Sequence, residues 1–251
     1  MTKQYKLKNK IYKENGERYI KLSRNQLRIL DSLFIDGGKE KKYYDNKDKL
    51  RYSEHSGLLD FSKSRLDRVI INAKQNLSDK EDHDILLPDN MIDAIDFEYI
   101  FHTHPSTPNF FGRLKEGILY EFPSISDLFH YIEHHNLGKT QGSIIISQEG
   151  MYIIKSISNK KIKIENENKL TDYLESELLN IQLLAIEDFN LNNDDILDDK
   201  KFKNIINDRK YLNMYNSLIN DINLKIFYKP RVKVKNNWIL DNVYLKVKPI
   251  E

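Results

Sequence analysis

The segment around residues 98–105 constrains the fold most, because it joins an apolar run to a pair of histidines. Glu98-Tyr99-Ile100-Phe101 predicts a buried strand that continues into His102-Thr103-His104-Pro105. Side chains on a strand repeat their direction every two residues, so His102 and His104 are expected to point the same way. A fold that accommodates this chain must therefore present both imidazoles on one face of a sheet, at the end of one strand.

A second motif, Pro123-Ser124-Ile125-Ser126-Asp127, predicts the start of a helix that ends near Gly138. Ser124 is a suitable N-cap, and an acidic residue in the first turn is typical of capping. Alone, each motif has a structural explanation: a helix cap, or two polar residues on the solvent face of a strand. In this order, Asp127 could complete a three-ligand cage with the two histidines. Three protein ligands and one open position are typical of a catalytic zinc ion.

The amino-acid composition excludes several kinds of catalytic site, metal site and partner. The 251 residues contain no cysteine, which excludes a cysteine nucleophile, disulfides, Cys-based zinc sites and the Cys-x-x-Cys signature of zinc deaminases. The 40 basic and 38 acidic residues nearly balance, so nucleic acid is not expected as an obligatory partner. No apolar run is long enough to cross a bilayer, and no secretory signal is visible. We therefore expect a globular cytoplasmic protein without a membrane partner.

The remaining patterns predict a mixed α/β (α+β) fold. Helices are expected over 25–34, capped by Ser23, and over 91–95, and strands over 57–61, 68–72, 143–146 and 151–155. Residues 36–53 and 105–123 are expected to be loops. The composition shifts near residue 160, which predicts a domain over 1–160 and a C-terminal extension over 161–251. In that extension we expect long amphipathic helices over 170–190 and 201–223, followed by strands over 225–248.

A general base is expected upstream of the histidines. Glu54 lies three residues before Gly57, which opens a predicted strand. A zinc hydrolase needs a base near the open coordination position, to take a proton from water and later deliver one to the leaving amine. Glutamate is the usual choice. Glu40 is a second candidate, although no glycine-led strand follows it at the corresponding spacing.

Together, Glu54, His102-Thr103-His104-Pro105 and Ser124-Ile125-Ser126-Asp127 resemble the motif of the JAB/MPN family of zinc metalloproteases, also called JAMM. The order of predicted elements agrees, and the resemblance covers roughly residues 18–157. It implies a three-layer, cytidine-deaminase-like fold in which His102, His104 and Asp127 bind Zn²⁺. It further implies that Glu54 is the general base and acid, and that Ser124 hydrogen-bonds the oxyanion. Family members commonly remove ubiquitin or ubiquitin-like proteins from lysine side chains, so the resemblance implies a metallo-isopeptidase or metalloprotease acting on a ubiquitin-like conjugate.

The sequence departs from the family pattern between the two motifs. Residues 106–123 form a longer connection than is usual there, and this insert could gate the site or recognise the substrate. Its aromatic side chains could contact a partner or fold onto the core; they are Phe110, Phe111, Tyr120 and Phe122. The insert and the Asn/Lys/Ile bias suggest a divergent, viral branch of the family, from a large DNA virus, with a place in the host cytoplasm or the virion.

Two alternatives stay open at this point. One is a non-catalytic MPN-type interaction module, in which the site is vestigial and the extension assembles partners. The other is an inverted zinc-peptidase motif in His130-Tyr131-Ile132-Glu133-His134, whose histidines would share a helix face. That motif would need a third ligand such as Glu175 or Glu177. Otherwise these histidines are surface residues, or they support Asp127 from one helical turn away.

Overall fold

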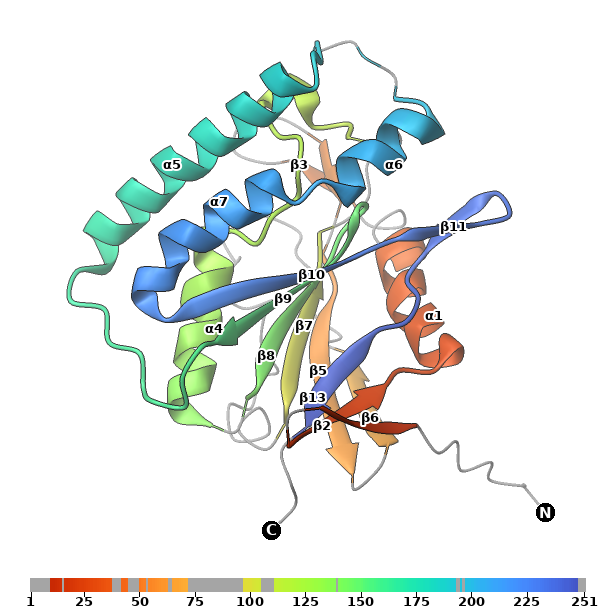
Figure 1. Ribbon diagram of the computed structural model, residues 1–251, viewed down its shortest axis with the longest axis vertical. Coiled ribbons are helices and arrows are strands. Elements are labelled where there is room, and N and C mark those ends of the chain that lie inside the picture. Colours follow the sequence, from red (N-terminus) through yellow and green to blue (C-terminus); the bar gives the residue numbers. More distant parts are fainter. Residues whose placement is uncertain are drawn as a thin grey trace.

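The computed structural model describes residues 10–247, apart from residues 15, 38–41, 45–49, 53, 63–64, 72–96, 105–110, 139, 193–194 and 196. A mixed sheet of six strands forms the centre of the described structure, in the order β10-β9-β8-β7-β5-β6 (Figure 1). Its strands are β5 (Ser56–Ser62), β6 (Arg65–Ile71), β7 (Tyr99–Thr103), β8 (Gly142–Ile146), β9 (Gly150–Ser156) and β10 (Leu224–Pro230). β7 and β8 run parallel, and all other neighbours are antiparallel.

Helices cover both faces of this sheet, so the expected mixed sheet flanked by helices is confirmed. α4 (Ile125–Leu137), α5 (Glu167–Asp188), α6 (Asp199–Asn207) and α7 (Lys210–Ile219) lie on one side, and α1 (Arg24–Ser32) lies on the other (Figure 1). Alternate residues of each strand supply the two cores. Ile145 and Ile154 pack in the core on the side of α4 to α7, whereas Ile144 and Ile153 pack in the core beside α1.

The register of β7 follows the same alternation. Phe101 pairs with Ile144, and His102 pairs with Ile145 in the neighbouring strand β8. Phe101 packs in the core beside α1. His102 therefore faces the side of the sheet that α4 covers, which is the geometry that a helix-borne third ligand requires.

The C-terminal half joins the central structure through two separate strands. β10 pairs with β9 in the six-stranded sheet, and β13 (Tyr244–Val247) pairs with β2 (Glu17–Lys21) in a smaller sheet completed by β1 (Ile11–Glu14). The core on the α4 side draws residues from both halves of the chain. Residues on either side of the expected boundary at 160 thus share one sheet and one core.

Several predicted elements are confirmed within a few residues. The helix capped by Ser23 is α1, which continues into a π-helical turn, η1 (Leu33–Gly37). The hairpins β5–β6 and β8–β9 form as expected, and the first long helix of the extension is α5. The strands expected near the end include a short hairpin of β11 (Val232–Val234) and β12 (Asn237–Ile239). The short helix expected over 91–95 lies outside the described residues.

Two predictions were wrong. The loop expected over 36–53 contains an antiparallel pair, β3 (Lys42–Tyr44) with β4 (Leu50–Tyr52). The single helix expected over 201–223 is divided into α6, α7 and a 3₁₀ turn, η4 (Asn220–Ile222). The break falls at Asp208, whose backbone is extended (φ −69°, ψ 140°). Its Oδ1 accepts the N–H of Lys210, two residues along the chain, at 2.6 Å, and this local contact favours a turn between the two helices.

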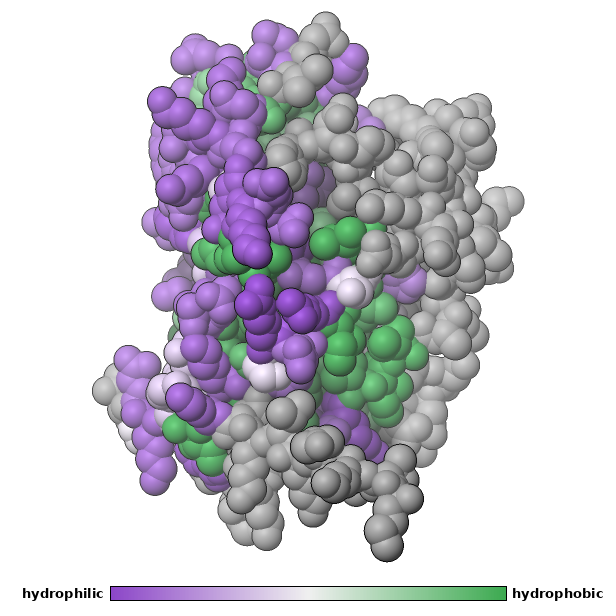
Figure 2. Space-filling model, turned by 90° about the vertical axis from the view of Figure 1, so that its right-hand side faces the viewer, coloured by the Kyte–Doolittle hydropathy of each residue, from purple (hydrophilic) through white to green (hydrophobic). Residues whose placement is uncertain are grey.

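The outer surface agrees with the charged composition. On the face shown in Figure 2, hydrophilic side chains dominate the coloured surface, with smaller apolar areas between them. Apolar side chains that are individually exposed are normal on folded proteins. None of the described helices combines the length and the apolar character needed to cross a membrane.

Candidate metal centre

The two histidines of the first motif come from the carboxyl end of β7. The backbone is held on both sides at this point: Thr103 donates its N–H to the His55 carbonyl at 2.9 Å, and His104 donates to the Ile146 carbonyl at 2.9 Å. His102 is buried and His104 is nearly so. Backbone hydrogen bonds thus hold the chain at the end of β7 and at the residue after it, and this fixes the positions of the two imidazoles.

The third residue comes from the first turn of α4. Ser124 is the N-cap, and its Oγ accepts the Asp127 N–H at 3.1 Å. In return, the Ser124 N–H donates to Asp127 Oδ2 at 2.7 Å. Tyr215 on α7 donates its O–H to the Pro123 carbonyl at 3.0 Å, which holds the chain entering the helix. The cap interpretation of Ser-x-x-Asp is therefore confirmed, and the same cap orients the Asp127 carboxylate.

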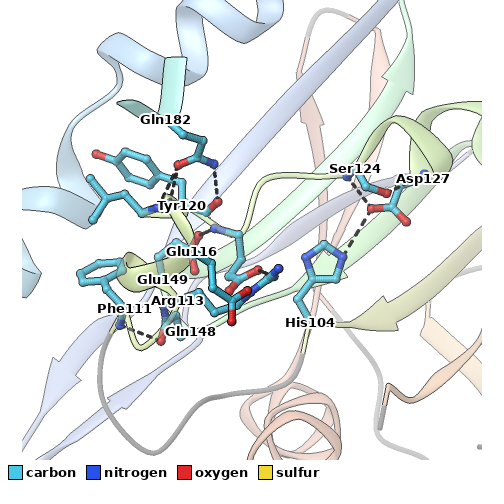
Figure 3. A network of polar contacts seen from close by, with 12 residues as sticks. His104, Phe111, Arg113, Glu116, Tyr120, Ser124, Asp127, Gln148, Glu149 and Gln182 are labelled. Atoms are coloured by element: carbon cyan, nitrogen blue, oxygen red, sulfur yellow. Dashed lines mark hydrogen bonds and ion pairs between the residues drawn. The ribbon is translucent and has the colours of Figure 1, made fainter. Parts of the chain in front are cut away.

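The three side chains converge on one point (Figure 3 shows His104 and Asp127). His102 Nε2 lies 3.2 Å from His104 Nε2 and 3.1 Å from Asp127 Oδ1, and His104 Nε2 lies 3.4 Å from Asp127 Oδ2. Ligands about 2.0–2.1 Å from a tetrahedral zinc ion are roughly 3.3 Å from one another. The donor atoms therefore already have the spacing of three corners of a tetrahedron. This buried group could hold a metal ion, and the hydrogen bonds to Asp127 supply the outer support that metal ligands need.

Electrostatics in this group favour a charged Asp127 carboxylate beside a cationic His104 imidazole when no metal competes. Burial alone would raise the pKa of Asp127, but the charges and hydrogen bonds of His102 and His104 hold it well below its usual range. Burial alone would likewise lower the pKa of His104, but the hydrogen bond and charge of Asp127 raise it to about 9. Metal binding at this site must therefore displace a proton.

Glu54 lies beside the same group. It precedes β5, in which Ser56 is paired with His102 of β7, and its charge contributes to the raised pKa of His104. Gly57 allows β5 to pack closely against its neighbouring strands, because a Cβ there would lie 2.0 Å from the Ile70 carbonyl oxygen and 2.7 Å from the Phe101 ring. Glu54 is half-buried. Its position fits a base next to the metal-binding group, and its catalytic role stays a prediction. Glu40 lies outside the described residues.

Among the residues that the structure describes, the inverted motif on α4 has no comparable third ligand. The rings of His130 and His134 are 4.8 Å apart, and burial lowers the pKa of His134. Glu175 on α5 is exposed. Within the described ranges, the group formed by His102, His104 and Asp127 is the one set of three metal-ligating side chains close enough to share an ion.

The insert and the turn between β8 and β9 both contribute buried side chains. Phe111, Tyr120 and Phe122 are buried in the core, so for these three the core interpretation is confirmed, while Phe110 lies outside the described residues. Glu149, expected only as part of a hairpin turn, is fully buried. Its Oε1 accepts the Glu121 N–H at 2.5 Å and the Tyr152 O–H at 3.0 Å. Burial and the charge of Glu121 raise the pKa of Glu149 to about 7.

Comparison with known proteins gives one informative match. The chain is 36% identical over 238 residues to an uncharacterized protein of Acanthamoeba polyphaga mimivirus. The match covers 91% of this chain and 65% of the relative, so the chain spans less than two thirds of that protein's length. No family model matches the chain, and no solved structure matches it. A viral relative agrees with the viral setting expected from the sequence, and its description assigns no activity.

Proposed function

We propose that this protein is a zinc-dependent isopeptidase or peptidase of the JAB/MPN type, and that its substrate is a conjugate of ubiquitin or a ubiquitin-like protein. The observation that carries the proposal is the convergence of His102, His104 and Asp127, from a strand end and a helix start, at the spacing of zinc ligands. The group has three protein ligands, which leaves one coordination position for water or substrate. Glu54 beside it supplies the base that hydrolysis needs.

Each residue has a defined task in this proposal. His102, His104 and Asp127 would hold the ion. When bound, a zinc ion acts as a Lewis acid that polarises the substrate carbonyl and lowers the pKa of water. Glu54 would accept the proton of the attacking water and pass it to the leaving amine. Ser124 accepts the Asp127 N–H through its Oγ, so its hydroxyl proton is available to an oxyanion. The N-terminus of α4 adds positive potential at the same place.

The absence of cysteine from the chain is compatible with this mechanism, because attack by water needs no covalent intermediate. The test uses the zinc-loaded full chain with ubiquitin joined through an isopeptide bond to lysine, and with ubiquitin carrying a fluorophore amide at its C-terminus. We expect cleavage by the wild type and a loss of at least about 100-fold in Glu54→Gln, since a general base contributes 10²–10⁴-fold.

Glu133→Gln is the matched control, because Glu133 is an exposed glutamate on α4, and it should cleave at the wild-type rate. Both variants should keep the wild-type zinc content. Conjugates that bind the zinc-loaded protein without being cleaved would instead favour the non-catalytic interaction module. Equal activity of Glu54→Gln and wild type would remove Glu54 from the mechanism.

A further inference from the structure

Arg113 in the insert is held beside the metal-binding group by two carboxylates. Its Nη1 donates to Glu121 Oε2 at 2.9 Å, and its Nε donates to Glu116 Oε2 at 3.3 Å. The charge of Glu121 is one contributor to the raised pKa of His104. Figure 3 shows Arg113 and Glu116 on the side of His104 away from Asp127. Two fixed anchors leave the guanidinium little rotational freedom.

The C-terminal extension holds the described part of the insert, residues 111–123, in place. Gln182 on α5 is buried, and its Oε1 accepts the N–H groups of Leu119 and Tyr120, each at 3.0 Å. Its Nε2 donates to the Tyr120 carbonyl at 2.7 Å. One amide thus satisfies three backbone groups of the insert, which would be costly to leave unpaired in the interior.

Further contacts fix both ends of the same segment. The Phe111 N–H donates to Gln148 Oε1 at 3.1 Å, and the Glu121 N–H donates to Glu149. The Tyr120 O–H donates to the Ile205 carbonyl of α6 at 3.1 Å. Figure 3 shows Phe111, Gln148, Glu149 and Tyr120 along the insert, between α5 and the strands. The segment that carries Arg113 is therefore held by buried contacts at both ends, and such support favours precise ligand contacts.

The guanidinium has donors to spare. Among the described residues, its Nη2 has no recorded hydrogen-bond partner, and the Arg113 side chain is 32% exposed. A guanidinium offers five N–H donors in a planar fork. With Glu116 and Glu121 ionised, the group of three carries a formal charge of −1. This charge opposes binding of a further carboxylate and leaves a neutral acceptor, such as a peptide carbonyl, as the suitable ligand.

We infer that Arg113 is a substrate-positioning residue whose Nη2 donates to a backbone carbonyl of a peptide bound at the metal centre. The inference rests on the proposed function, and it gives the insert and the extension a shared task. The insert carries the donor, and Gln182 fixes the insert from α5. The substrate is recognised as an extended main chain, so this contact does not depend on side-chain identity.

Two zinc-binding probes test the inference without requiring turnover. Acetohydroxamate offers only the chelating group, whereas triglycine hydroxamate adds a peptide backbone without side chains. With the zinc-loaded full chain, calorimetry should show tighter binding of the triglycine probe. Arg113→Gln and Arg113→Lys should weaken that probe about tenfold, about 1.4 kcal/mol, and leave acetohydroxamate unchanged. Arg28→Gln, at an exposed arginine of α1, is the matched control and should alter neither probe.

Gln182→Leu should produce the same selective loss from a distance. Hydrogen exchange at the Leu119 and Tyr120 amides should accelerate in this variant, and its effect on the triglycine probe should not add to that of Arg113→Gln. Zinc content reports whether the variant is folded. If Gln182→Leu is not folded, Gln182→Met replaces it, because methionine removes the same three contacts with a side chain of similar size.

The outcomes separate the two proposals. If neither probe binds the zinc-treated wild type, the metal centre and the proposed function fail, and the role of Arg113 fails with them. If both probes bind and the Arg113 substitutions change the affinity for both probes equally, the metal centre is supported and the role of Arg113 is refuted. Unchanged hydrogen exchange at the Leu119 and Tyr120 amides in both Gln182 variants would refute the role of Gln182 in holding the insert.

Discussion

Glu149 should make the stability of this protein fall as pH rises through neutrality. Its side chain is fully buried, and burial together with the charge of Glu121 raises its pKa to about 7 from an ordinary 4.5. Below about pH 4.5 the residue is protonated in both folded and unfolded chains. Between 4.5 and 7 only the folded chain keeps the proton, so the free energy of unfolding decreases with pH.

The magnitude follows from the same two values. Each tenfold change in proton affinity corresponds to about 1.4 kcal/mol, so the difference between 4.5 and about 7 corresponds to about 3 kcal/mol. This loss is complete above about pH 8. Glu149→Gln replaces the carboxyl with a neutral amide that still offers an oxygen to the Glu121 N–H and the Tyr152 O–H. The variant should therefore lack this part of the pH dependence.

Urea unfolding with a chelator present, from pH 5 to pH 8, measures the effect. The amide nitrogen takes the place of Oε2, which has no hydrogen-bond partner within the described structure. This should cost about 1–3 kcal/mol at pH 5. Relative to wild type, the variant should then gain about 2–3 kcal/mol between pH 5 and pH 8, since part of the loss occurs below pH 5. Glu133→Gln, at an exposed position, should differ from wild type by less than about 0.5 kcal/mol at every pH. Parallel stability curves for wild type and Glu149→Gln would refute the reasoning.

Three further predictions concern the metal centre, its helix cap and the buried ion pair of Asp31 and Arg231. Apparent zinc affinity should rise up to tenfold per pH unit between about pH 7 and 9, and then level off, because His104 must lose a proton whose pKa is about 9; a flat profile by competition with a chromogenic chelator would contradict this. Ser124→Ala should lower the free energy of unfolding by about 1 kcal/mol but weaken zinc less than about tenfold, since the Ser124 backbone N–H still binds Asp127; a complete loss of zinc would show that the hydroxyl does more than cap. Asp31→Ala should destabilise the fold by about 3–5 kcal/mol, because it leaves the buried Arg231 guanidinium without its carboxylate partner; a change below about 1 kcal/mol in urea unfolding would contradict this.

The predictable elements were those that carried both periodicity and a local stop or start signal. α1 and α4 each begin at a serine with a reciprocal side-chain cap, and β8 and β9 are apolar runs joined by a short turn. The break at Asp208 was missed because the amphipathic pattern continues across it. Its signal was a single aspartate whose side chain accepts the backbone N–H two residues along the chain, a contact that favours a turn.

The metal-binding group was predictable because its members lie in two short motifs with fixed spacing. The positions of Glu149 and Gln182 were not. Their partners lie 28 and 62 residues away along the chain, and a glutamate in a turn or a glutamine on a helix is ordinarily solvated. Their roles arise only when the insert folds against α5 and β9, which no local pattern encodes.

Metal content of the purified full chain tests the central claim most directly. After reconstitution with zinc and removal of excess ion, elemental mass spectrometry should find about one zinc per wild-type chain and almost none in Asp127→Ala. Asp172→Ala, at an exposed aspartate of α5, should keep the wild-type content. Zinc absent from the reconstituted wild type, or retained undiminished in Asp127→Ala, would contradict a metal centre formed by His102, His104 and Asp127.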